Sequence, residues 1–299
     1  MTAAEARKKA LGILETRSRP ASHPASNPTF SLDISVILSA LLGVQRSFLV
    51  AHPERELSQA EEKAFFSAIA DRSRGLPVAY ITGTKEFWGL PFHVTPDVLI
   101  PKPDTEILVE RAVSLAAALH ARSGGRPVRV LDVCTGSGCI AVSIAVSCPF
   151  AEVTATDISP AALAVARENA ETLLPAGTGS AHRIIFEMGD LRNGLPEGPF
   201  DLVVSNPPYV PAMVARELLA DGRNEPILAL DGGEDGLDLV RALIDSAGQS
   251  LAQGGRILIE TGEYNAGAAA GYLNTAGFTA IVIHRDLENQ ERVIEGTLA

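Results

Sequence analysis

Cysteine is scarce in this chain: Cys134, Cys139 and Cys148 stand close together in an otherwise cysteine-free sequence. A disulfide scaffold needs many more cysteines, and a structural zinc site needs four ligands at characteristic spacings. We therefore predict no metal site, and we interpret the three thiols as small apolar side chains in and beside one strand–helix turn. The composition is typical of a reducing compartment.

Long apolar runs and an excess of positive charge are also missing. No run reaches the roughly 20 residues that a membrane-spanning helix requires. The N-terminus mixes Glu5 with Arg7, Lys8 and Lys9 and has no apolar signal-peptide core. The chain has 25 Lys and Arg against 36 Asp and Glu, a formal net charge of −11, which disfavours tight nucleic-acid binding by the chain as a whole. We expect a cytoplasmic protein with no membrane partner and no direct nucleic-acid partner.

The chain is rich in apolar residues, at 46%, and they follow a helical spacing in its first quarter. Ser58 and Glu61 form a capping-box pattern that predicts the start of one helix. The Ser/Pro-rich stretch at 17–29 predicts a loop, and the alternation at 79–99, which includes the only tryptophan, Trp88, predicts a β-hairpin. The predicted helices cover residues 3–14, 31–42 and 59–74.

From residue 128 onward, predicted strands alternate with predicted helices, as in a mainly parallel sheet with helices on both faces. Only a polar connection joins the last two strands, so one of them is expected to run antiparallel. A preceding helix, with Asp104 and Thr105 as candidate caps, ends near Arg122. The predicted strands are 128–133, 152–156, 183–187, 201–205, 256–261, 278–284 and 291–296, and the predicted helices are 138–147, 160–172, 237–252 and 265–275.

These patterns divide the chain into three parts. We expect residues 1–77 to form a small helical domain, with recognition of a partner as its functional role and packing as the alternative. Residues 78–98 are expected to form a β-hairpin linker, and residues 99–299 an α/β domain.

The strand at 128–133 enters a Gly-rich turn, Cys134-Thr135-Gly136-Ser137-Gly138, that opens the next helix. The two glycines allow a sharp bend and the close approach of a ligand. The first such turn of an open α/β sheet is where a nucleotide-like cofactor binds. The pattern alone has low specificity, because Gly136, Gly138 and Ala141 also satisfy a relaxed dinucleotide-binding motif.

Acidic residues after the next two strands complete a candidate cofactor site. Asp157 can accept hydrogen bonds from ribose hydroxyls, with capping of the following helix as its alternative role. Asp190 can accept from an adenine amino group while Leu191 packs against the ring, with an ordinary surface turn as the alternative. The Gly-rich turn and Asp157 fit a nicotinamide cofactor or S-adenosylmethionine.

The residues at the end of the fourth predicted strand distinguish between these two cofactors. They read Asn206-Pro207-Pro208-Tyr209, and the prolines fix the backbone while donating no N–H. We expect a stiff turn whose carbonyls lack ladder partners, which is suited to holding an NH₂ group. A dehydrogenase has no evident use for such a turn, whereas an enzyme that methylates amino groups has one.

With these motifs the chain resembles class I S-adenosylmethionine-dependent methyltransferases and, more narrowly, the HemK/PrmC family of protein-(glutamine-N5) methyltransferases. The NPPY sequence alone is shared with adenine-N6 and cytosine-N4 DNA methyltransferases, whereas its combination with the other segments is far more specific. This chain departs from the family pattern at Cys134 (usually Gly), Lys102 (usually Arg) and Leu191 (aromatic in some members). The matching segments are Glu86-Phe87-Trp88, 99–106, 132–138, 206–209, Glu225-Pro226, Ala229-Leu230, Gly232-Gly233, 235–238, Arg285-Asp286 and Glu291-Arg292.

The resemblance implies a class I (Rossmann-like) methyltransferase with a seven-stranded sheet and an N-terminal substrate-recognition domain. It implies a monomeric enzyme that transfers a methyl group from S-adenosyl-L-methionine, leaving S-adenosyl-L-homocysteine, to the GGQ glutamine of class-1 peptide chain release factors. The residues expected to act in catalysis are Asn206, Pro207 and Tyr209, with Pro208 added for substrate binding. The residues expected to bind the donor are Cys134, Thr135, Gly136, Ser137, Gly138, Asp157, Asp190, Leu191 and Asn206.

Three alternatives stay open at this stage. The same chemistry could act on a glutamine of a ribosomal protein, a choice that residues 1–77 would decide. A DNA adenine-N6 methyltransferase would need a target-recognition region and a basic groove, which the charge of −11 disfavours. A non-catalytic donor-binding module would not require Asn206 and Tyr209.

Overall fold

The computed structural model describes residues 1–17, 29–174, 184–220 and 224–299. Within them the chain forms two compact units, Met1–Thr84 with Leu218–Asn224, and Lys85–Glu217 with Glu225–Ala299. Most of the loop predicted at 17–29 and the first residue of the strand predicted at 183–187 lie outside the described residues.

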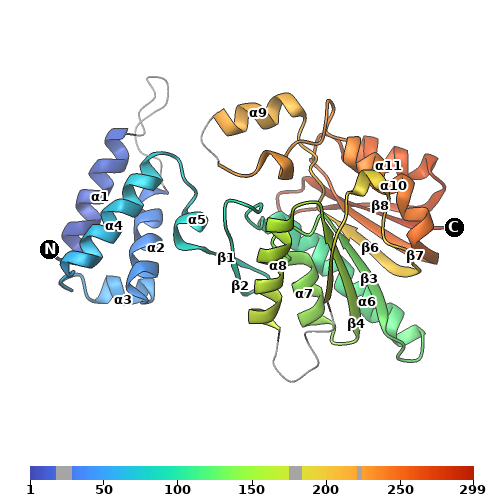
Figure 1. The fold of residues 1–299 in the computed structure, drawn as a ribbon, viewed down its shortest axis with the longest axis horizontal. Helices are drawn as coiled ribbons and strands as arrows, with labels where there is room; N and C mark the ends of the chain where they lie inside the picture. Colours follow the sequence, from blue (N-terminus) through green and yellow to red (C-terminus); the bar gives the residue numbers. More distant parts are fainter. Residues whose placement is uncertain (18–28, 175–183, 221–223) are drawn as a thin grey trace. The chain divides into compact units, whose positions relative to one another are not determined.

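The first unit is helical, and the three helices predicted there are confirmed (Figure 1). Leu14, Ile37 and Phe65, from three different helices, are fully buried in its apolar core. Two short helices were not predicted, α3 and α5. The helices are α1 Ala3–Arg17, α2 Phe30–Leu42, α3 Arg46–Ala51, α4 Gln59–Ser73 and α5 Val78–Thr82.

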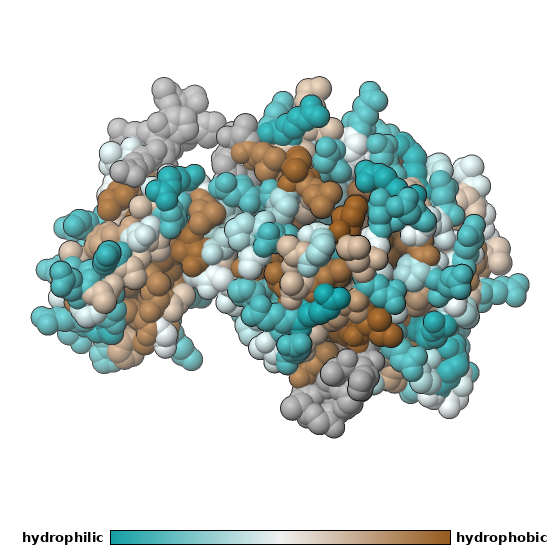
Figure 2. Space-filling view, in the orientation of Figure 1, coloured by the Kyte–Doolittle hydropathy of each residue, from teal (hydrophilic) through white to brown (hydrophobic). Residues whose placement is uncertain are grey.

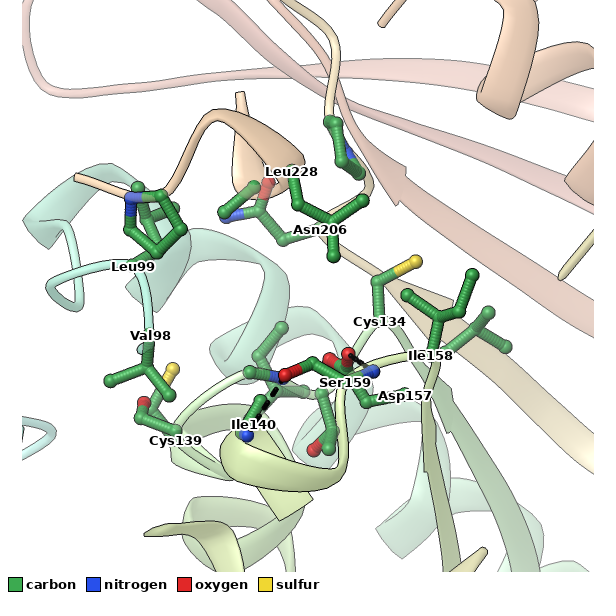
Figure 3. A pocket seen from close by; sticks show the side chains of 18 of the residues that line it. Val98, Leu99, Cys134, Cys139, Ile140, Asp157, Ile158, Ser159, Asn206 and Leu228 are labelled. Atoms are coloured by element: carbon green, nitrogen blue, oxygen red, sulfur yellow. Dashed lines mark hydrogen bonds between the residues drawn. The ribbon is translucent and has the colours of Figure 1, made fainter. Parts of the chain in front are cut away.

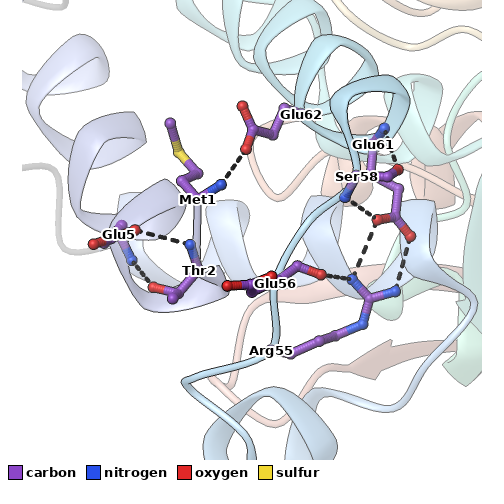
Figure 4. A network of polar contacts seen from close by, with 8 residues as sticks. All are labelled: Met1, Thr2, Glu5, Arg55, Glu56, Ser58, Glu61 and Glu62. Carbon is purple, nitrogen blue, oxygen red and sulfur yellow. Dashed lines mark hydrogen bonds and ion pairs between the residues drawn. The ribbon is translucent and has the colours of Figure 1, made fainter.

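Polar contacts fix the start of α4 (Figure 4). Ser58 and Glu61 form both hydrogen bonds of the predicted capping box, which is therefore confirmed. The Arg55 guanidinium donates to Glu61 at 2.8 Å, and the N-terminal ammonium of Met1 pairs with Glu62. The Arg55 contact is the main reason that the pKa of Glu61 falls to about 2. The chain's first residues are thereby tied to α4.

The predicted hairpin is present but shorter than expected. Its strands are β1 Thr84–Phe87 and β2 Leu90–His93, joined at Trp88 and Gly89, whose φ values of 54° and 70° suit a tight two-residue turn. The prediction was wrong for residues 79–82, which belong to α5. Pro77 precedes this helix and Gly83, with φ 71°, ends it, so local stop signals outweigh the short apolar alternation.

The second unit contains a seven-stranded sheet in the order β5-β4-β3-β6-β7-β9-β8. β9 runs antiparallel to both of its neighbours and the other pairs are parallel, which confirms the predicted sheet. The strands are β3 Val128–Val133, β4 Ala151–Asp157, β5 Ile184–Met188, β6 Phe200–Ser205, β7 Leu251–Glu260, β8 Phe278–Arg285 and β9 Glu291–Leu298. The helices are α6 Glu106–Arg122, α7 Cys139–Ser147, α8 Pro160–Leu173, α9 Ala212–Ala220, α10 Asp238–Ser250 and α11 Ala266–Thr275, with 3₁₀ turns η1 Pro103–Thr105, η3 Leu191–Asn193 and η4 Ile227–Ala229.

Both faces of this sheet are buried, because successive side chains of a strand point to opposite faces. Val130 and Val204 lie in one apolar cluster with residues of α6 and α7. Leu131 and Val203 lie in the other, with residues of α10 and α11. The central strands are thus held rigidly, and the ends of β3, β4, β6 and β7 meet at one edge of the sheet.

Helix α9 was not predicted, and it carries an exposed apolar face. Met213 is 73% exposed and Val214 is 43% exposed, and Figure 2 shows apolar side chains gathered over this helix. Its first residues follow the Asn206 turn closely in sequence. Among the described residues, no helix has the length and apolar content needed to cross a membrane.

Candidate functional site

A cavity of about 260 Å³ lies where β3, β4 and β6 end (Figure 3). It is lined by apolar side chains such as Val98, Ile140 and Ile158, and by a smaller number of polar groups. An apolar pocket with a few convergent polar groups at the carboxyl edge of a parallel sheet is the usual place for a small organic ligand. Of the residues expected to bind the donor, the cavity is lined by Cys134, Thr135, Gly136, Ser137, Asp157, Asp190, Leu191 and Asn206.

The Gly-rich turn forms one wall of this cavity. Gly136 has φ 54°, and a Cβ added there would meet nothing within 4 Å, so the turn leaves open space on this side. Gly138 does not line the cavity; it has φ 78°, and an added Cβ would lie 3.1 Å from the Ala166 side chain. Gly138 is therefore required for packing of the turn against α8. Cys134 has φ 59°, a conformation that favours glycine.

Asp132, a buried carboxyl in β3, fixes the Gly-rich turn by hydrogen bonds. It was not among the site residues predicted from the sequence. Its Oδ2 accepts from the Thr135 hydroxyl at 2.6 Å and from the Ala141 N–H at 3.2 Å. Burial raises the pKa of Asp132 to about 7. The available signal was an acid between Leu131 and Val133 in a mostly apolar strand, since a buried carboxyl needs hydrogen-bond partners.

Asp157 holds the turn from the side. Its Oδ2 accepts from the Gly136 N–H and its Oδ1 from the Ser159 N–H, each at 2.9 Å. Ser159, not Asp157, caps α8 by accepting from the Ala162 N–H. Burial raises the pKa of Asp157, while the backbone donors oppose this rise. Each carboxylate oxygen retains acceptor capacity toward the cavity, so binding of ribose hydroxyls stays a prediction.

Asp190 and Leu191 follow β5 and line the cavity on that side. Asp190 accepts from the Arg192 N–H at 2.9 Å and so caps the 3₁₀ turn η3. Leu191 is 6% exposed and packs into the core while also lining the cavity. The carboxylate and the apolar side chain are adjacent, as contacts with an amino group and its ring would require, and this role also stays a prediction.

The Asn206 turn forms the opposite wall. Asn206 Nδ2 donates to Thr105 Oγ1 at 3.2 Å, and Pro207 and Pro208 are buried. Thr105 therefore does not act as the expected cap of α6, since its side chain makes no cap hydrogen bond. Asn206 and Pro208 line the cavity, whereas Pro207 and Tyr209 are not among its lining residues.

One carbonyl of this turn is held by side chains. The Tyr209 carbonyl accepts from Asn265 Nδ2 at 3.2 Å and from the Tyr264 hydroxyl at 3.3 Å, which are side-chain donors and not the N–H groups of a helix or a strand ladder. No described residue donates a hydrogen bond to the Pro207 carbonyl. The Tyr209 hydroxyl donates to Glu260 Oε1 at 3.0 Å.

Glycines of the following loop support the backbone of the same turn. A Cβ added at Gly232 would lie 2.7 Å from the Pro208 oxygen, and one added at Gly236 would lie 2.3 Å from the Tyr209 oxygen. The loop is joined to the turn by the hydrogen bond from Val210 N–H to the Leu230 carbonyl, at 3.0 Å. The Gly-rich segment after Leu230 is thus explained by close backbone contact.

Lys102 lines the cavity, where its charge is paired. Its ammonium lies 2.5 Å from Glu225 Oε1, and Glu225 is 5% exposed. The pair joins the segment before η1 to the segment before η4, so Lys102 has a structural partner at the cavity wall. Among the described residues, no cluster of His, Cys, Asp and Glu could hold a metal ion.

Comparison with known proteins shows two matching family models, the PrmC N-terminal domain over residues 24–83 and the methyltransferase small domain over residues 112–225. The release factor glutamine methyltransferase of Bordetella pertussis is 42% identical over 268 residues, covering 89% of this chain and 94% of the relative. The enzyme of the same name from Geobacter sulfurreducens is 40% identical, with 89% of each chain covered.

Among solved structures, the catalytic domain of hMettl16 in complex with a MAT2A 3′UTR hairpin aligns with a TM-score of 0.54. The alignment covers 81% of this chain and 82% of that one, at 14% sequence identity. This likeness shows the methyltransferase fold alone.

Proposed function

Because the chain belongs to the family of release factor glutamine methyltransferases, we propose that it methylates the side-chain amide nitrogen (N5) of the GGQ glutamine in class-1 peptide chain release factors. The methyl donor is S-adenosyl-L-methionine. One observation carries the proposal beyond family membership: the cavity at the Gly-rich turn is also lined by Asn206, so a donor site and an amide-binding turn share one space.

The residues of the cavity fit this donor. Because Gly136 has no side chain and open space beside it, the donor can approach the backbone of the turn closely. The carboxylates of Asp157 and Asp190 offer acceptors for its hydroxyl and amino groups. Leu191, Ile158 and Ile140 offer an apolar wall for a ring. The buried Asp132 keeps the turn in place from the core side.

The acceptor groups of the Asn206 turn fit an amide. Since Asn206 Nδ2 is engaged with Thr105, its Oδ1 is left to accept one N–H of the glutamine side chain. The Pro207 carbonyl, which has no donor among the described residues, can accept the other. Two acceptors would hold the amide plane in one orientation, and Tyr209 would pack on the amide and keep water out.

Orientation is the main contribution that these residues can make to rate. An amide nitrogen is a weak nucleophile, because its lone pair is delocalised into the carbonyl. S-adenosylmethionine supplies an activated methyl group, so that a C–N bond forms while the C–S bond breaks and its electron pair stays on sulfur. Fixed orientation of two reactants can lower a barrier by roughly 7–11 kcal/mol in favourable cases. The amide nitrogen loses its proton to solvent after transfer, without a dedicated base.

The helical first unit is proposed to select the protein substrate. Its described residues include no catalytic constellation of the kind found at the cavity, and the PrmC N-terminal domain model covers most of it. We place the boundaries of this recognition domain at residues 1–77 and those of the linker at residues 78–98, and we propose that the enzyme works in the cytoplasm as a monomer.

The proposal is tested by incubation with methyl-labelled S-adenosylmethionine and three acceptors in parallel: a class-1 release factor, ribosomal proteins and DNA. We expect label on the release factor, and none when its GGQ glutamine is replaced by alanine. Label on ribosomal proteins alone would change the substrate, and label on DNA alone would overturn the proposed chemistry.

A further inference from the structure

Glu260 is a buried carboxyl at the end of β7 for which the reaction described above has no use. β7 pairs with β6 in a register that sets Ile259 opposite Ser205, so the next residues, Glu260 and Asn206, lie side by side at the ends of these strands. The residue is 1% exposed, and burial raises the pKa of its carboxyl to about 7. A buried ionisable group at this position needs an explanation.

The charge of Glu260 is not neutralised by a direct ion pair with any described Lys, Arg or His. Arg292 on β9 favours the charged form from a distance, and Asp104 opposes it. Arg292 is itself paired with Asp286 at 2.8 Å and with Asp104 at 3.4 Å. An apolar side chain of similar size would avoid the cost of burying this carboxyl, so a role in packing alone does not account for it.

The polar groups nearest to Glu260 belong to the amide-binding turn and its support. The Tyr209 hydroxyl donates to Oε1 at 3.0 Å, and the Thr105 hydroxyl also stabilises the charged form of the carboxyl. Oε2 is buried and has no hydrogen-bond partner among the described residues, so the carboxylate keeps acceptor capacity. Glu260 therefore interacts with Tyr209, which belongs to the Asn206 turn, and with Thr105, which accepts a hydrogen bond from Asn206.

Thr105 links the carboxylate to Asn206. A hydroxyl has one hydrogen to donate, and Thr105, which is 1% exposed, already accepts from Asn206 Nδ2 at 3.2 Å. The Thr105 hydrogen is not used in that contact, so the negative charge of an ionised Glu260 attracts it and the Thr105 oxygen stays an acceptor. Asn206 must then present its NH₂ group to Thr105, and its Oδ1 points the other way.

We propose that Glu260 is a positioning residue of the methyl transfer, whose carboxylate fixes the Tyr209 ring directly and the Asn206 amide through Thr105. The inference rests on the proposed function, since it assigns a purpose to the orientation of Asn206 Oδ1. In the protonated form the carboxyl becomes a donor, Thr105 loses its directed acceptor, and the Asn206 amide is no longer held in one orientation.

The first test is Glu260→Gln, which keeps the size of the side chain and replaces the acceptor-only carboxylate by an amide that can donate. We expect kcat for the release factor to fall by about 10- to 100-fold, while the dissociation constant for S-adenosylmethionine, measured by calorimetry, changes by less than about twofold. The wild-type kcat should rise with pH through neutrality as Glu260 ionises, and this rise should be absent in the variant.

Thr105 supplies a second test that leaves the carboxyl in place. Thr105→Val removes the hydroxyl and should reduce kcat to a similar degree, whereas Thr105→Ser keeps the hydroxyl and should retain most of it. A merely structural role of Glu260 would not distinguish valine from serine at position 105, nor change the pH profile.

Asp201→Asn is the matched control, because Asp201 is another buried carboxyl, 7% exposed, at the opposite end of β6. It pairs with Arg126 at 2.7 Å, far along the strand from the Asn206 turn. This variant should lower the melting temperature while keeping the wild-type kcat and pH profile.

If the wild type methylates the release factor and both Glu260→Gln and Thr105→Val keep its kcat and pH profile, the positioning role is wrong and the function stands. If the wild type does not methylate the release factor, the proposed function itself fails.

Discussion

At the scale of single residues, the donor and acceptor parts of the site are separable. Asp157 ends β4 and contacts the Gly-rich turn, whereas Asn206 follows β6 and contacts Thr105. No hydrogen bond joins the side chains of these two described residues. Substitutions at the two positions should therefore affect different steps.

Asn206→Ala should abolish measurable transfer, because it removes the Oδ1 acceptor that orients the glutamine amide. Loss of one such oriented group costs roughly 100- to 1000-fold in kcat. Donor binding should stay within a modest factor of wild type when measured by calorimetry. Full turnover by this variant would exclude the proposed role of Asn206.

Asp157→Ala should instead weaken donor binding. It removes the proposed ribose acceptor and the partner of the Gly136 N–H, and charged hydrogen bonds of this kind are worth about 1.5–3 kcal/mol, or roughly 10- to 100-fold in affinity. Glu152→Ala, an exposed carboxylate on the same strand, is the control and should bind normally. Unchanged affinity of Asp157→Ala in calorimetry would remove the ribose assignment.

Cys134→Gly should stabilise the protein by about 1 kcal/mol, because Cys134 has φ 59°, where a side chain is strained and glycine is not. The measurement is the free energy of unfolding in urea. Cys139→Gly is the control: Cys139 begins α7 with ordinary helical geometry, so glycine there should destabilise. A loss of stability in Cys134→Gly would show that the thiol's packing outweighs the backbone strain.

At the scale of elements, the Asn206 turn depends on the loop that follows it. Gly236→Ala would place a Cβ 2.3 Å from the Tyr209 oxygen at φ 79°, so the turn must shift and transfer should fall by about tenfold or more. Gly254→Ala has a similar φ of 74° but meets nothing within 4 Å. The rate of release-factor methylation should therefore fall in Gly236→Ala and be retained in Gly254→Ala. Equal activity of the two variants would contradict a role for this loop in holding the turn.

The elements that the sequence predicts well here are those with a strong periodicity of apolar residues. The buried strands of the sheet, the long helices and the presence of an antiparallel strand among the last two follow from apolar runs separated by turn residues. The elements that were missed, α3, α5 and α9, are short, with α3 covering Arg46–Ala51 and α5 covering Val78–Thr82. Helices of one or two turns depend on tertiary packing more than on local propensity.

The contacts that sequence could not predict are those made across the sheet edge. Asn206, Asp157 and the Gly-rich turn could be placed at one edge, because parallel strands end together. The contact between Tyr209 and Glu260 joins residues 51 positions apart in the sequence, and the contact between Asn206 and Thr105 joins residues 101 positions apart. No local pattern encodes such pairs, and Thr105 was accordingly expected to be a helix cap.

At the scale of the whole molecule, two buried carboxyls should make stability depend on pH near neutrality. The pKa values of Asp132 and Glu260 are both raised to about 7 by burial, above the roughly 4 of an unfolded chain. Between these values the folded state binds more protons, so the free energy of unfolding should fall as pH rises, by up to about 1.4 kcal/mol per pH unit for each group.

This dependence is measured by urea unfolding between pH 5 and pH 8, and Glu260→Gln should flatten part of it. Glu61 acts in the opposite sense: its pKa is lowered to about 2, so its contribution is present above about pH 4 and is lost in stronger acid. A free energy of unfolding that rises with pH from 5 to 7 would contradict the raised pKa values of the two buried carboxyls.

The most direct test of the central claim is peptide mass spectrometry of a class-1 release factor after incubation with this protein and S-adenosylmethionine. We predict one added methyl group on the GGQ glutamine side chain with the wild-type protein and none with Asn206→Ala. An unmodified GGQ glutamine after incubation with the wild-type protein, or equal modification by the variant, would contradict the account.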